Sequence, residues 1–566
     1  MKAYTQYAAA IATILPSGLS SPLNARGNTS MVYNFSELTA SPSLAWSPCY
    51  SNFTCALLEV PRDYANKTAG TLNIAIIKKP GPAPNAQEVL VNPGGPGGSS
   101  VSMILSSSAL IEAKIGTDYS LVGIDPRGIN NSEPSSDCFP GYSFQTRNAI
   151  LSEPLGLADI TSEKALKTHY QSLLGYGKWC SDMYSVNGTA RYASTVATAQ
   201  DMLHYIQLRA ADTGKAPEEA KLWYYGISYG SILGPTFASL YPSHVGRMLI
   251  DGVLDLADYY DGGWETATDD SDKAARYFFQ QCFDAGPALC LFHQNASSPQ
   301  VIQDRYEALL EELKQHPFSV AQAIPDPKNL LTVPGALPPT PYVLQWTDIS
   351  SQVFATLYYL NPVLVVLMDY LLLALQNRDV SILSSITLKA QINSFSPSYD
   401  ERMGRTLVVC LDSDGRSNYT AFEDYKGFVE GMHKKSKYGG LHVAALSGPV
   451  CSQMQVRAPE SQRFDGVPRV NGTDTPILFV SSVADPVTPL SAARKMNSQF
   501  PGSGLLVFDN VGHTAHFQSI KCVSEHEKRY MRDGTLPPAN TVCEVEEPNP
   551  WIALAKLSNV TGATPL

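Results

Sequence analysis

The chain has 566 residues, of which 44% are hydrophobic and 16% charged, and its formal net charge is -11. This composition is typical of a folded globular protein and excludes an intrinsically disordered chain. The negative charge disfavours nucleic acid and anionic membrane surfaces as partners. The length suits a large α/β domain with an insertion, or two or three domains.

The N-terminus resembles a secretory signal peptide. Met1 and Lys2 precede a short apolar run over 7–15, and small residues lie beyond it, so we predict a signal peptide at 1–25. Ten Asn-x-Ser/Thr sequences suit a glycosylated chain and are candidate N-glycosylation sites: Asn28, Asn34, Asn52, Asn66, Asn130, Asn187, Asn295, Asn418, Asn471 and Asn559. These features predict a protein that is secreted or held in the lumen of the secretory pathway.

The cysteines support the same compartment. They are ten in number and fall into sequential pairs, which predict five disulfides: Cys49–Cys55, Cys138–Cys180, Cys282–Cys290, Cys410–Cys451 and Cys522–Cys543. Spacing alone does not prove this connectivity. The sequence contains no Cys-x-x-Cys, and no cluster of His, Asp and Glu has ligand spacing, so we predict neither a metal site nor a cofactor.

Two strands are predicted at 72–78 and 89–91, and the second runs into the glycine-rich segment 92–98. Glycines directly after a buried strand leave the backbone bare, so that N–H groups can approach a ligand closely. A flexible linker is the alternative, but linkers rarely emerge from a core strand. We interpret the segment as an oxyanion-hole loop with the N–H of Gly95 as the donor.

A further strand is predicted at 119–124, and it runs into Asp125-Pro126-Arg127-Gly128. We expect Asp125 and Arg127 to lock that turn with a local salt bridge. A helix over 191–209 and a strand over 247–254 follow. The alternation of strands and helices predicts a doubly wound, mostly parallel α/β sheet, which places ligands at the carboxyl ends of its strands.

Between that helix and that strand, an apolar, aromatic strand at 222–225 leads into Gly226-Ile227-Ser228-Tyr229-Gly230 and then into a helical segment. This context predicts a nucleophile elbow, in which the serine takes a strained conformation between strand and helix. The two glycines supply the space that the sharp turn requires. Ser228 is therefore the candidate nucleophile.

From residue 256 the pattern becomes helical, with segments at 274–282, 301–313, 350–360 and 363–376. We predict a mostly helical cap over 256–470, inserted between the two parts of the hydrolase core at 26–255 and 471–566. The apolar run at 363–375 contains Asp369 and is shorter than the roughly 20 residues that a membrane span needs, so we expect a buried or groove-lining helix.

An elbow serine needs a base, and the base needs an orienting acid. Asp485 is the one acid in the loop that follows a predicted strand at 476–480, and His513 follows a predicted strand at 505–508. Both positions fit the chain order Ser, Asp, His of α/β-hydrolases. His516 is the alternative base, or it borders the substrate pocket.

Several segments carry a family resemblance over nearly the whole mature chain: 55–64, 92–97, 125–128, 226–230, 251–253, 410–412, 485–489, 512–513 and 532–537. They resemble the α/β-hydrolase serine peptidases of the prolyl aminopeptidase and tripeptidyl aminopeptidase group, particularly its secreted tripeptidyl branch. The resemblance implies Ser228, Asp485 and His513 as the catalytic triad, with the backbone N–H groups of Gly95 and Tyr229 as oxyanion donors. The chain departs from the family at 452–454, which lacks the usual Trp, and at Thr514, where Gly is frequent.

We therefore expect a secreted serine exopeptidase that releases tripeptides, other short peptides or single residues from free N-termini through an acyl-enzyme. A carboxylesterase or lactonase with a diverged cap is the alternative on the same triad, and fold alone does not separate the two. A catalytically inactive binding protein would have no physical need for all three groups. The expected partner is a peptide or a small ester, with no nucleic acid and no membrane span.

If the enzyme is an exopeptidase, a carboxylate must bind the substrate ammonium group. The opening stretch of the predicted cap is rich in acids, most of them expected on the solvated surface, and one is expected to face Ser228: Asp255, Asp258, Asp261, Glu265, Asp269, Asp270 or Asp272.

Overall fold

The computed structural model describes residues 31–561 except 322–340, 381–382, 384–398, 417–418, 447, 471–472 and 474. The predicted signal peptide and the candidate glycosylation sites Asn28, Asn418 and Asn471 lie outside these residues, and so does the side chain of Asn559. The chain divides into two compact units. One comprises 31–274 and 394–545, and the other includes 275–393 and the segment from 546 onward.

The first unit is built on a ten-stranded sheet. Its strands from β5 onward are parallel, with an antiparallel edge formed by β1, β2 and β3. This architecture confirms the predicted α/β-hydrolase fold with its mostly parallel sheet. In spatial order the strands are β1 (Ser47–Cys49), β2 (Phe53–Pro61), β3 (Thr71–Lys79), β5 (Ser120–Ile124), β4 (Glu88–Asn92), β6 (Leu222–Ile227), β7 (Val245–Asp251), β10 (Leu478–Ala484), β11 (Gly504–Val511) and β12 (Val542–Cys543).

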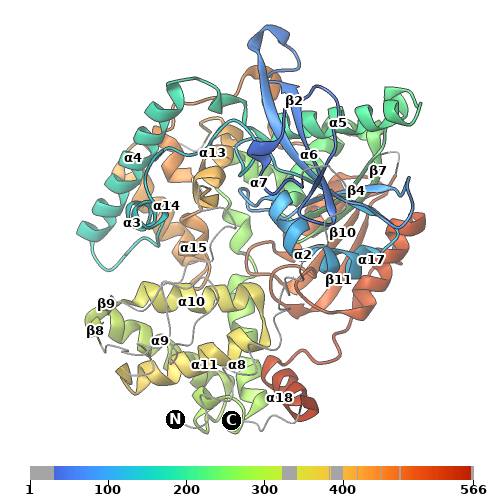
Figure 1. Cartoon of the computed structure of the whole chain (residues 1–566). Helices are drawn as coiled ribbons and strands as arrows, with labels where there is room; N and C mark the ends of the chain where they lie inside the picture. The colour runs from blue at the N-terminus through green and yellow to red at the C-terminus, as the bar shows by residue number, and fades with distance from the viewer. Residues whose placement is uncertain are drawn as a thin grey trace. The chain divides into compact units, whose positions relative to one another are not determined.

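Helices α2 (Ser100–Ile115) and α17 (Lys521–Asp533) pack against each other and against one face of this sheet (Figure 1). Helices α5 (Thr195–Asp212) and α6 (Gly230–Leu240) also pack together and contact β6. Successive side chains of β6 point to opposite faces of the sheet, which explains why one helix pair packs on each face. Tyr225 and Ile227 join the core under α2 and α17, whereas a Cβ added at Gly234 of α6 would meet Tyr224.

The turn after β5 differs from the expected local salt bridge. Arg127 is fully buried and binds Asp201 of α5, with Nε 2.7 Å from Oδ2 and Nη2 2.8 Å from Oδ1. Asp125 instead accepts hydrogen bonds from the Ser99 hydroxyl and the Val101 N–H, at the start of α2. The free N–H groups of a helix start attract a carboxylate, and a buried guanidinium needs several acceptors, so the two side chains separate.

The first unit also contains helices from the later part of the chain: α13 (Glu401–Ser413), α14 (Phe422–Lys435) and α15 (Gly440–Ala444). The division of the chain therefore falls at other residues than the predicted cap at 256–470. Hydrogen bonds account for part of this difference, because Asp412 of α13 accepts from Thr195, and Gln462 donates to the carbonyl of Arg62.

The second unit is helical and carries one small two-stranded sheet, β8 (Phe318–Val320) and β9 (Tyr342–Leu344). The apolar run expected to be a buried or groove-lining helix forms α11 (Pro362–Gln376), most of whose residues are buried. Its acid, Asp369, accepts hydrogen bonds from the N–H groups of Leu291 and Phe292, both at 2.7 Å. Burial raises the pKa of Asp369 to about 6. Among the described residues of this unit, the other α-helices are most of α8 (Ser271–Ala285), then α9 (Pro299–Gln315), α10 (Trp346–Tyr359) and α18 (Pro550–Thr561).

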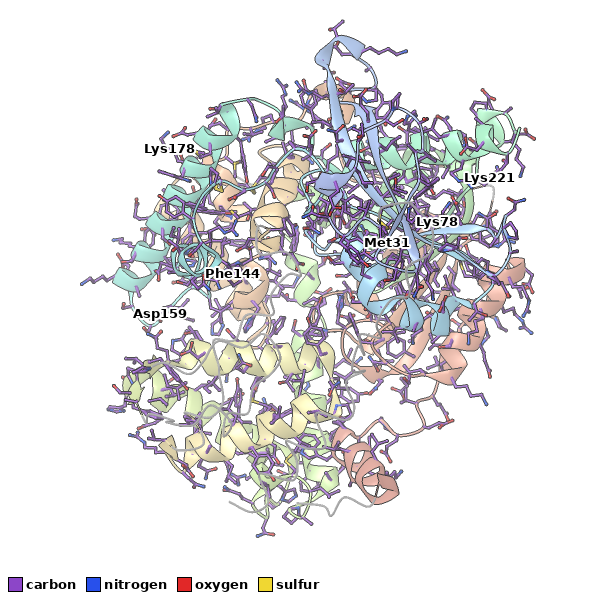
Figure 2. The ribbon with its side chains drawn as sticks, viewed as in Figure 1. Met31, Lys78, Phe144, Asp159, Lys178 and Lys221 are labelled. Carbon is purple, nitrogen blue, oxygen red and sulfur yellow. A yellow bond between two sulfur atoms is a disulfide. The ribbon has the colours of Figure 1, made fainter. Side chains whose placement is uncertain are left out.

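All ten cysteines are joined in the five predicted pairs, with S–S distances from 2.01 to 2.05 Å. Yellow sulfur–sulfur bonds in Figure 2 mark disulfides, and the labelled Lys178 lies in helix α4 (Glu163–Ser185), which carries Cys180. Within the described part of the chain, no helix has both the length and the apolar character to cross a bilayer.

The described glycosylation candidates differ in exposure. Five of them are exposed: Asn34, Asn52, Asn66, Asn187 and Asn295. Asn130 is half-buried, and its Nδ2 donates to the Ser99 hydroxyl at 3.1 Å. A glycan on that nitrogen would compete with this hydrogen bond.

Candidate active site

Ser228 lies at the end of β6 with a backbone φ of 57°, in the left-handed region that few non-glycine residues adopt. Such a conformation costs about 1–3 kcal/mol and persists only where the surroundings hold it. The N–H of Ser228 donates to the carbonyl of Asp251 at 2.9 Å. The glycines on either side are required: a Cβ at Gly226 would lie 2.6 Å from the Gly230 carbonyl oxygen, and one at Gly230 would lie 3.2 Å from the Asn92 carbonyl oxygen. This is the geometry expected of a nucleophile elbow.

The glycine loop after β4 lies directly over this elbow. A Cβ added at Gly94 would lie 2.8 Å from the Ser228 Cβ and 3.0 Å from the Tyr229 nitrogen, so no side chain fits there. Among the residues that the structure describes, the N–H groups of Gly95 and Tyr229 donate no hydrogen bond. The glycine loop and the elbow therefore each place one backbone donor near the serine, Gly95 from the loop and Tyr229 from the elbow.

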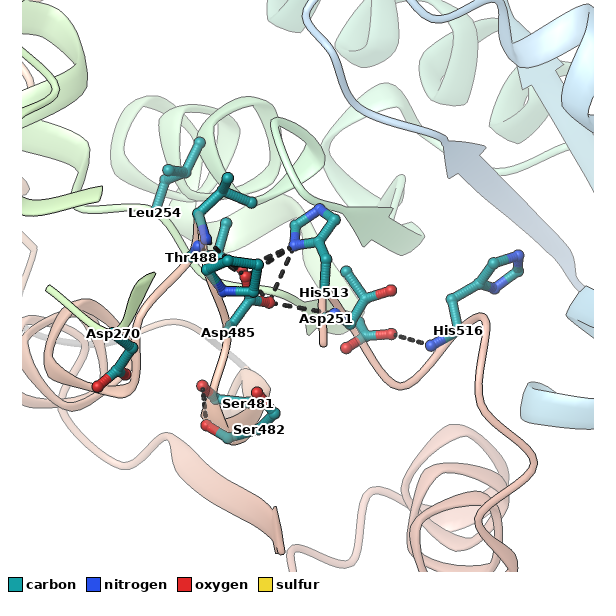
Figure 3. A network of polar contacts seen from close by, with 12 residues as sticks. Asp251, Leu254, Asp270, Ser481, Ser482, Asp485, Thr488, His513 and His516 are labelled. Atoms are coloured by element: carbon teal, nitrogen blue, oxygen red, sulfur yellow. Dashed lines mark hydrogen bonds and ion pairs between the residues drawn. The ribbon is translucent and has the colours of Figure 1, made fainter. Parts of the chain in front are cut away.

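Asp485 and His513 meet where β10 and β11 end (Figure 3). The imidazole Nδ1 lies 2.9 Å from Oδ2 and 3.1 Å from Oδ1 of Asp485. The carboxylate also accepts the N–H groups of Val487 and Thr488 at 2.9 Å, the Thr488 hydroxyl at 2.5 Å and the Thr514 N–H at 3.1 Å. Both side chains are buried, so the carboxylate is fixed from several directions and can orient the ring.

The end of β7 connects this pair to the elbow. The carbonyl of Asp251 accepts the Ser228 N–H, and the next residue, Gly252, faces the imidazole. A Cβ at Gly252 would lie 3.3 Å from the Cε1 of His513 and 2.5 Å from the Cγ2 of Thr514. The three residues that the sequence analysis selected therefore converge on neighbouring strand ends of one unit.

His516, the alternative base, lies elsewhere. Its ring is buried, and its Nδ1 is 3.1 Å from the hydroxyl of Tyr225. Burial and the nearby Lys114 lower its pKa to about 3. Figure 3 shows its backbone N–H directed at the carboxylate of Asp251 and its ring apart from Asp485.

Most acids at the start of the predicted cap are occupied by their own neighbours. Asp261 and Glu265 are exposed. The others have these partners: Lys495 for Asp255, Thr266 for Asp258, Ser491 and Lys435 for Asp269, the Leu490 N–H for Asp270, and Ser436 for Asp272. These contacts fix the acids in local structure, and a substrate role for any of them stays a prediction.

A different acid, Glu401, lies at the glycine loop and was not selected from the sequence. Its Oε1 is 3.4 Å from the position of a Cβ at Gly95, and a Cβ at Gly97 would lie 2.5 Å from its carbonyl oxygen. The side chain is exposed, and within the described part of the chain its carboxylate has no hydrogen bond or ion pair. Desolvation of the carboxylate by nearby protein atoms raises its pKa, whereas the charge of Arg405, one helical turn further on, lowers that pKa. Its contact with the loop spans some 300 residues of sequence, so no local pattern could have indicated it.

Residues 441–543, which include Asp485 and His513, match a protein family described as TAP-like. The chain is 26% identical over 508 residues to the serine protease Hip1 of Mycobacterium tuberculosis, covering 88% of this chain and 90% of that protein. It is 24% identical over 518 residues to a tripeptidyl aminopeptidase of Streptomyces coelicolor, covering 89% and 86%. It is also 25% identical over 521 residues to carboxylesterase B of Mycobacterium tuberculosis, covering 89% and 90%. These similarities support the resemblance seen in the sequence motifs.

Proposed function

We propose that the chain is a serine hydrolase of the tripeptidyl-aminopeptidase-like group of α/β-hydrolases and that it is an exopeptidase, which cleaves short peptides from free N-termini. One observation carries the choice of an amine-bearing substrate. Glu401 places a carboxylate without a protein partner against Gly95, in the loop that lies over Ser228. A desolvated ammonium group needs such a partner, whereas a simple ester does not.

In this proposal, Ser228 is the nucleophile and His513 the general base. The serine Oγ attacks the scissile carbonyl while the imidazole takes its proton, and the proton then passes to the leaving amine. Asp485 binds the Nδ1 side of the ring, so it selects the tautomer whose Nε2 can accept that proton, and it stabilises the imidazolium that forms. In the second half, the imidazole takes a proton from a water molecule that attacks the acyl carbonyl, and this proton passes to the Ser228 Oγ as the ester bond breaks and the released peptide leaves as its carboxylate.

The N–H groups of Gly95 and Tyr229 are the proposed oxyanion donors. Backbone donors near the nucleophile, held by the strained elbow and by the glycine loop, would stabilise the negative charge that develops on the carbonyl oxygen. The absence of a side chain at Gly94 lets the loop approach the serine this closely.

The position of Glu401 also sets an upper limit on the length of the released peptide. The contacts through Gly94 and Gly95 place its carboxylate no more than about 13 Å from Ser228, given a Cα–Cα step of about 3.8 Å. Three extended residues span about 10 Å. A tripeptide between the ammonium anchor and the scissile bond fits this reach, in line with the peptide length in the name of the Streptomyces relative.

A carboxylesterase is the second candidate, because carboxylesterase B is a relative at similar identity and coverage. The test compares tripeptide anilides with free and acetylated N-termini, and a plain ester. We expect acetylation to lower kcat/KM by about 10²-fold, the order of effect of leaving a charge unpaired. Equal cleavage of blocked peptides and esters would replace the exopeptidase with the esterase.

Glu401→Gln tests the anchor itself. We expect it to lower kcat/KM for the free-amine peptide by about 10²-fold and to leave the acetylated peptide unchanged. Glu430→Gln, on the exposed surface of α14, is the matched control. If acetylation matters but Glu401→Gln does not, the enzyme is an exopeptidase whose anchor is another acid.

We further propose that the protein acts outside the cell or in the secretory lumen. The five disulfides and the exposed sequons support this location. Mass mapping of the native protein for disulfides and glycans tests it, and ten free thiols would refute it.

A further inference from the structure

A cluster of buried titratable side chains lies behind the loop that follows His513, on the sheet face covered by α2 and α17. Its members come from four elements: Lys114 from α2, Asp251 from the end of β7, His516 from the loop and Glu527 from α17. All four are 2% exposed or less. Each buried charge in this cluster needs an opposite charge or hydrogen bonds, because an unpaired buried charge lowers the stability of the fold.

Lys114 and Asp251 hold the loop from its two sides. The Nζ of Lys114 donates to the carbonyls of Ala515 at 2.7 Å and Gln518 at 2.5 Å. The Asp251 carboxylate accepts the N–H groups of Ala515 at 2.9 Å and His516 at 2.7 Å. Both backbone groups of Ala515, two residues after His513, are therefore fixed by ionic side chains.

Glu527 is different, because neither of its carboxylate oxygens has a hydrogen-bond partner among the described residues. Lys114 attracts the ionised form, and Asp251 repels it. Tyr225 of β6 and Lys528 of the same helix are the other titratable groups near it. Lys114 can balance one carboxylate, and Asp251 has two N–H donors that favour its ionised form. The proton therefore resides on Glu527, whose pKa burial raises.

We propose that Lys114, Asp251 and Glu527 form a proton-linked clamp that positions His513, with the loop held while Glu527 keeps its proton and loosened when that proton is released. All three are positioning residues that act through the loop backbone. Ionisation of Glu527 adds a second negative charge beside Asp251 and competes for Lys114, which then holds the two carbonyls less well. This inference rests on the proposed role of His513 as the base.

The pH dependence of kcat at saturating substrate tests the clamp. The wild-type kcat should fall by about 10-fold across the alkaline range as Glu527 ionises, since small misplacements of a catalytic group have effects up to about 10²-fold. Glu527→Gln should keep neutral-pH kcat within about 3-fold and lose that fall. Glu525→Gln, exposed on the same helix, should retain it. Substrate titration is common to all three enzymes, so the difference between them isolates Glu527.

Lys114→Met provides a second measurement. It should lower kcat by about 10- to 100-fold with little change in KM, because the substrate-binding groups are untouched. If this variant does not fold, the Glu527→Gln profile still decides. Identical alkaline limbs for wild type and Glu527→Gln would overturn the clamp. Failure of the proposed base is distinct, because it would appear as full activity in His513→Ala, and failure of the exopeptidase proposal would appear as equal cleavage of blocked peptides and esters.

Discussion

Two carboxylates of the first unit differ in how many hydrogen bonds their oxygens accept from the protein. Asp485, at the end of β10, accepts hydrogen bonds from five donors, whereas Glu401, at the start of α13, accepts none from the described residues. A carboxylate that must hold a catalytic ring in one orientation is fixed more firmly when other groups of the protein donate hydrogen bonds to it. A carboxylate that binds a ligand instead needs oxygens that accept no hydrogen bond from the protein. The contrast separates two proposed sites, which we call the catalytic region, at the strand ends, and the recognition region, at the glycine loop.

Among the variants of the catalytic region, Ser228→Ala should cause the largest loss of kcat. Loss of the hydroxyl removes the acyl-enzyme route, and the loss of triad members lowers kcat by about 10⁴ to 10⁶. The fold and the recognition region should persist, because the serine hydroxyl makes no hydrogen bond that holds the elbow among the described residues. Hydrolysis of the tripeptide anilide and labelling by a fluorophosphonate measure both effects.

The matched control is Ser231→Ala, a buried serine of α6 whose hydroxyl accepts the Leu254 N–H at 2.9 Å. Its loss removes a structural hydrogen bond and leaves the label on Ser228. A label that persists in Ser228→Ala at another residue would contradict the nucleophile assignment.

His513→Ala and His516→Ala decide which of the two imidazole rings is the general base of the catalytic region. His513→Ala should lower kcat by about 10⁴ or more. His516→Ala removes the hydrogen bond between its ring and the Tyr225 hydroxyl, which costs about 1 kcal/mol of stability, and should change kcat by less than about 10-fold. Steady-state kinetics and thermal unfolding of both variants test this. The reverse ranking would transfer the role of base to His516.

The placement of the three proposed catalytic residues at strand ends could be predicted, because each of them follows a strand in the sequence pattern. A strand end directly before Ser228 and Asp485, and separated by one residue from His513, is a local pattern that can be recognised without a structure. The strand ends themselves were misplaced, because β10 continues through Ser481 and Ser482, which are polar but buried. The fold class followed from the same alternation of strands and helices.

The groups that depend on contacts distant in sequence could not be predicted. Glu401 meets Gly95, and Lys114 meets Ala515, with no spacing that links them. Helix α2, which carries Lys114, was itself not predicted, since the three serines at 106–108 interrupt its apolar periodicity. The Arg127–Asp201 pair likewise joins two elements, whereas sequence reasoning considered only the nearest acid.

The smallest expected effect concerns a third acid, Asp412, near the end of the helix that begins with Glu401. Like Asp485 it is buried and saturated, with hydrogen bonds from the Thr195 N–H at 2.9 Å, the Thr195 hydroxyl at 2.5 Å and the Tyr259 hydroxyl at 2.9 Å. Burial nevertheless raises its pKa to about 6. Hydrogen bonds alone therefore do not keep a buried carboxyl acidic.

The sign of the resulting pH dependence can be tested with Asp412→Asn. The folded protein binds this proton at higher pH than the unfolded chain, whose aspartates titrate near pH 4, so this group adds stability as the pH falls from 7 through 6 toward 4. The asparagine does not titrate. The stability of wild type relative to Asp412→Asn should thus rise by up to about 3 kcal/mol over that window, seen as a widening gap in unfolding temperature. Asp465→Asn, which removes an exposed partner of Arg469, should show no such widening. A gap for Asp412→Asn that narrows at low pH would mean that the hydrogen bonds to this carboxyl outweigh its burial and hold it ionised.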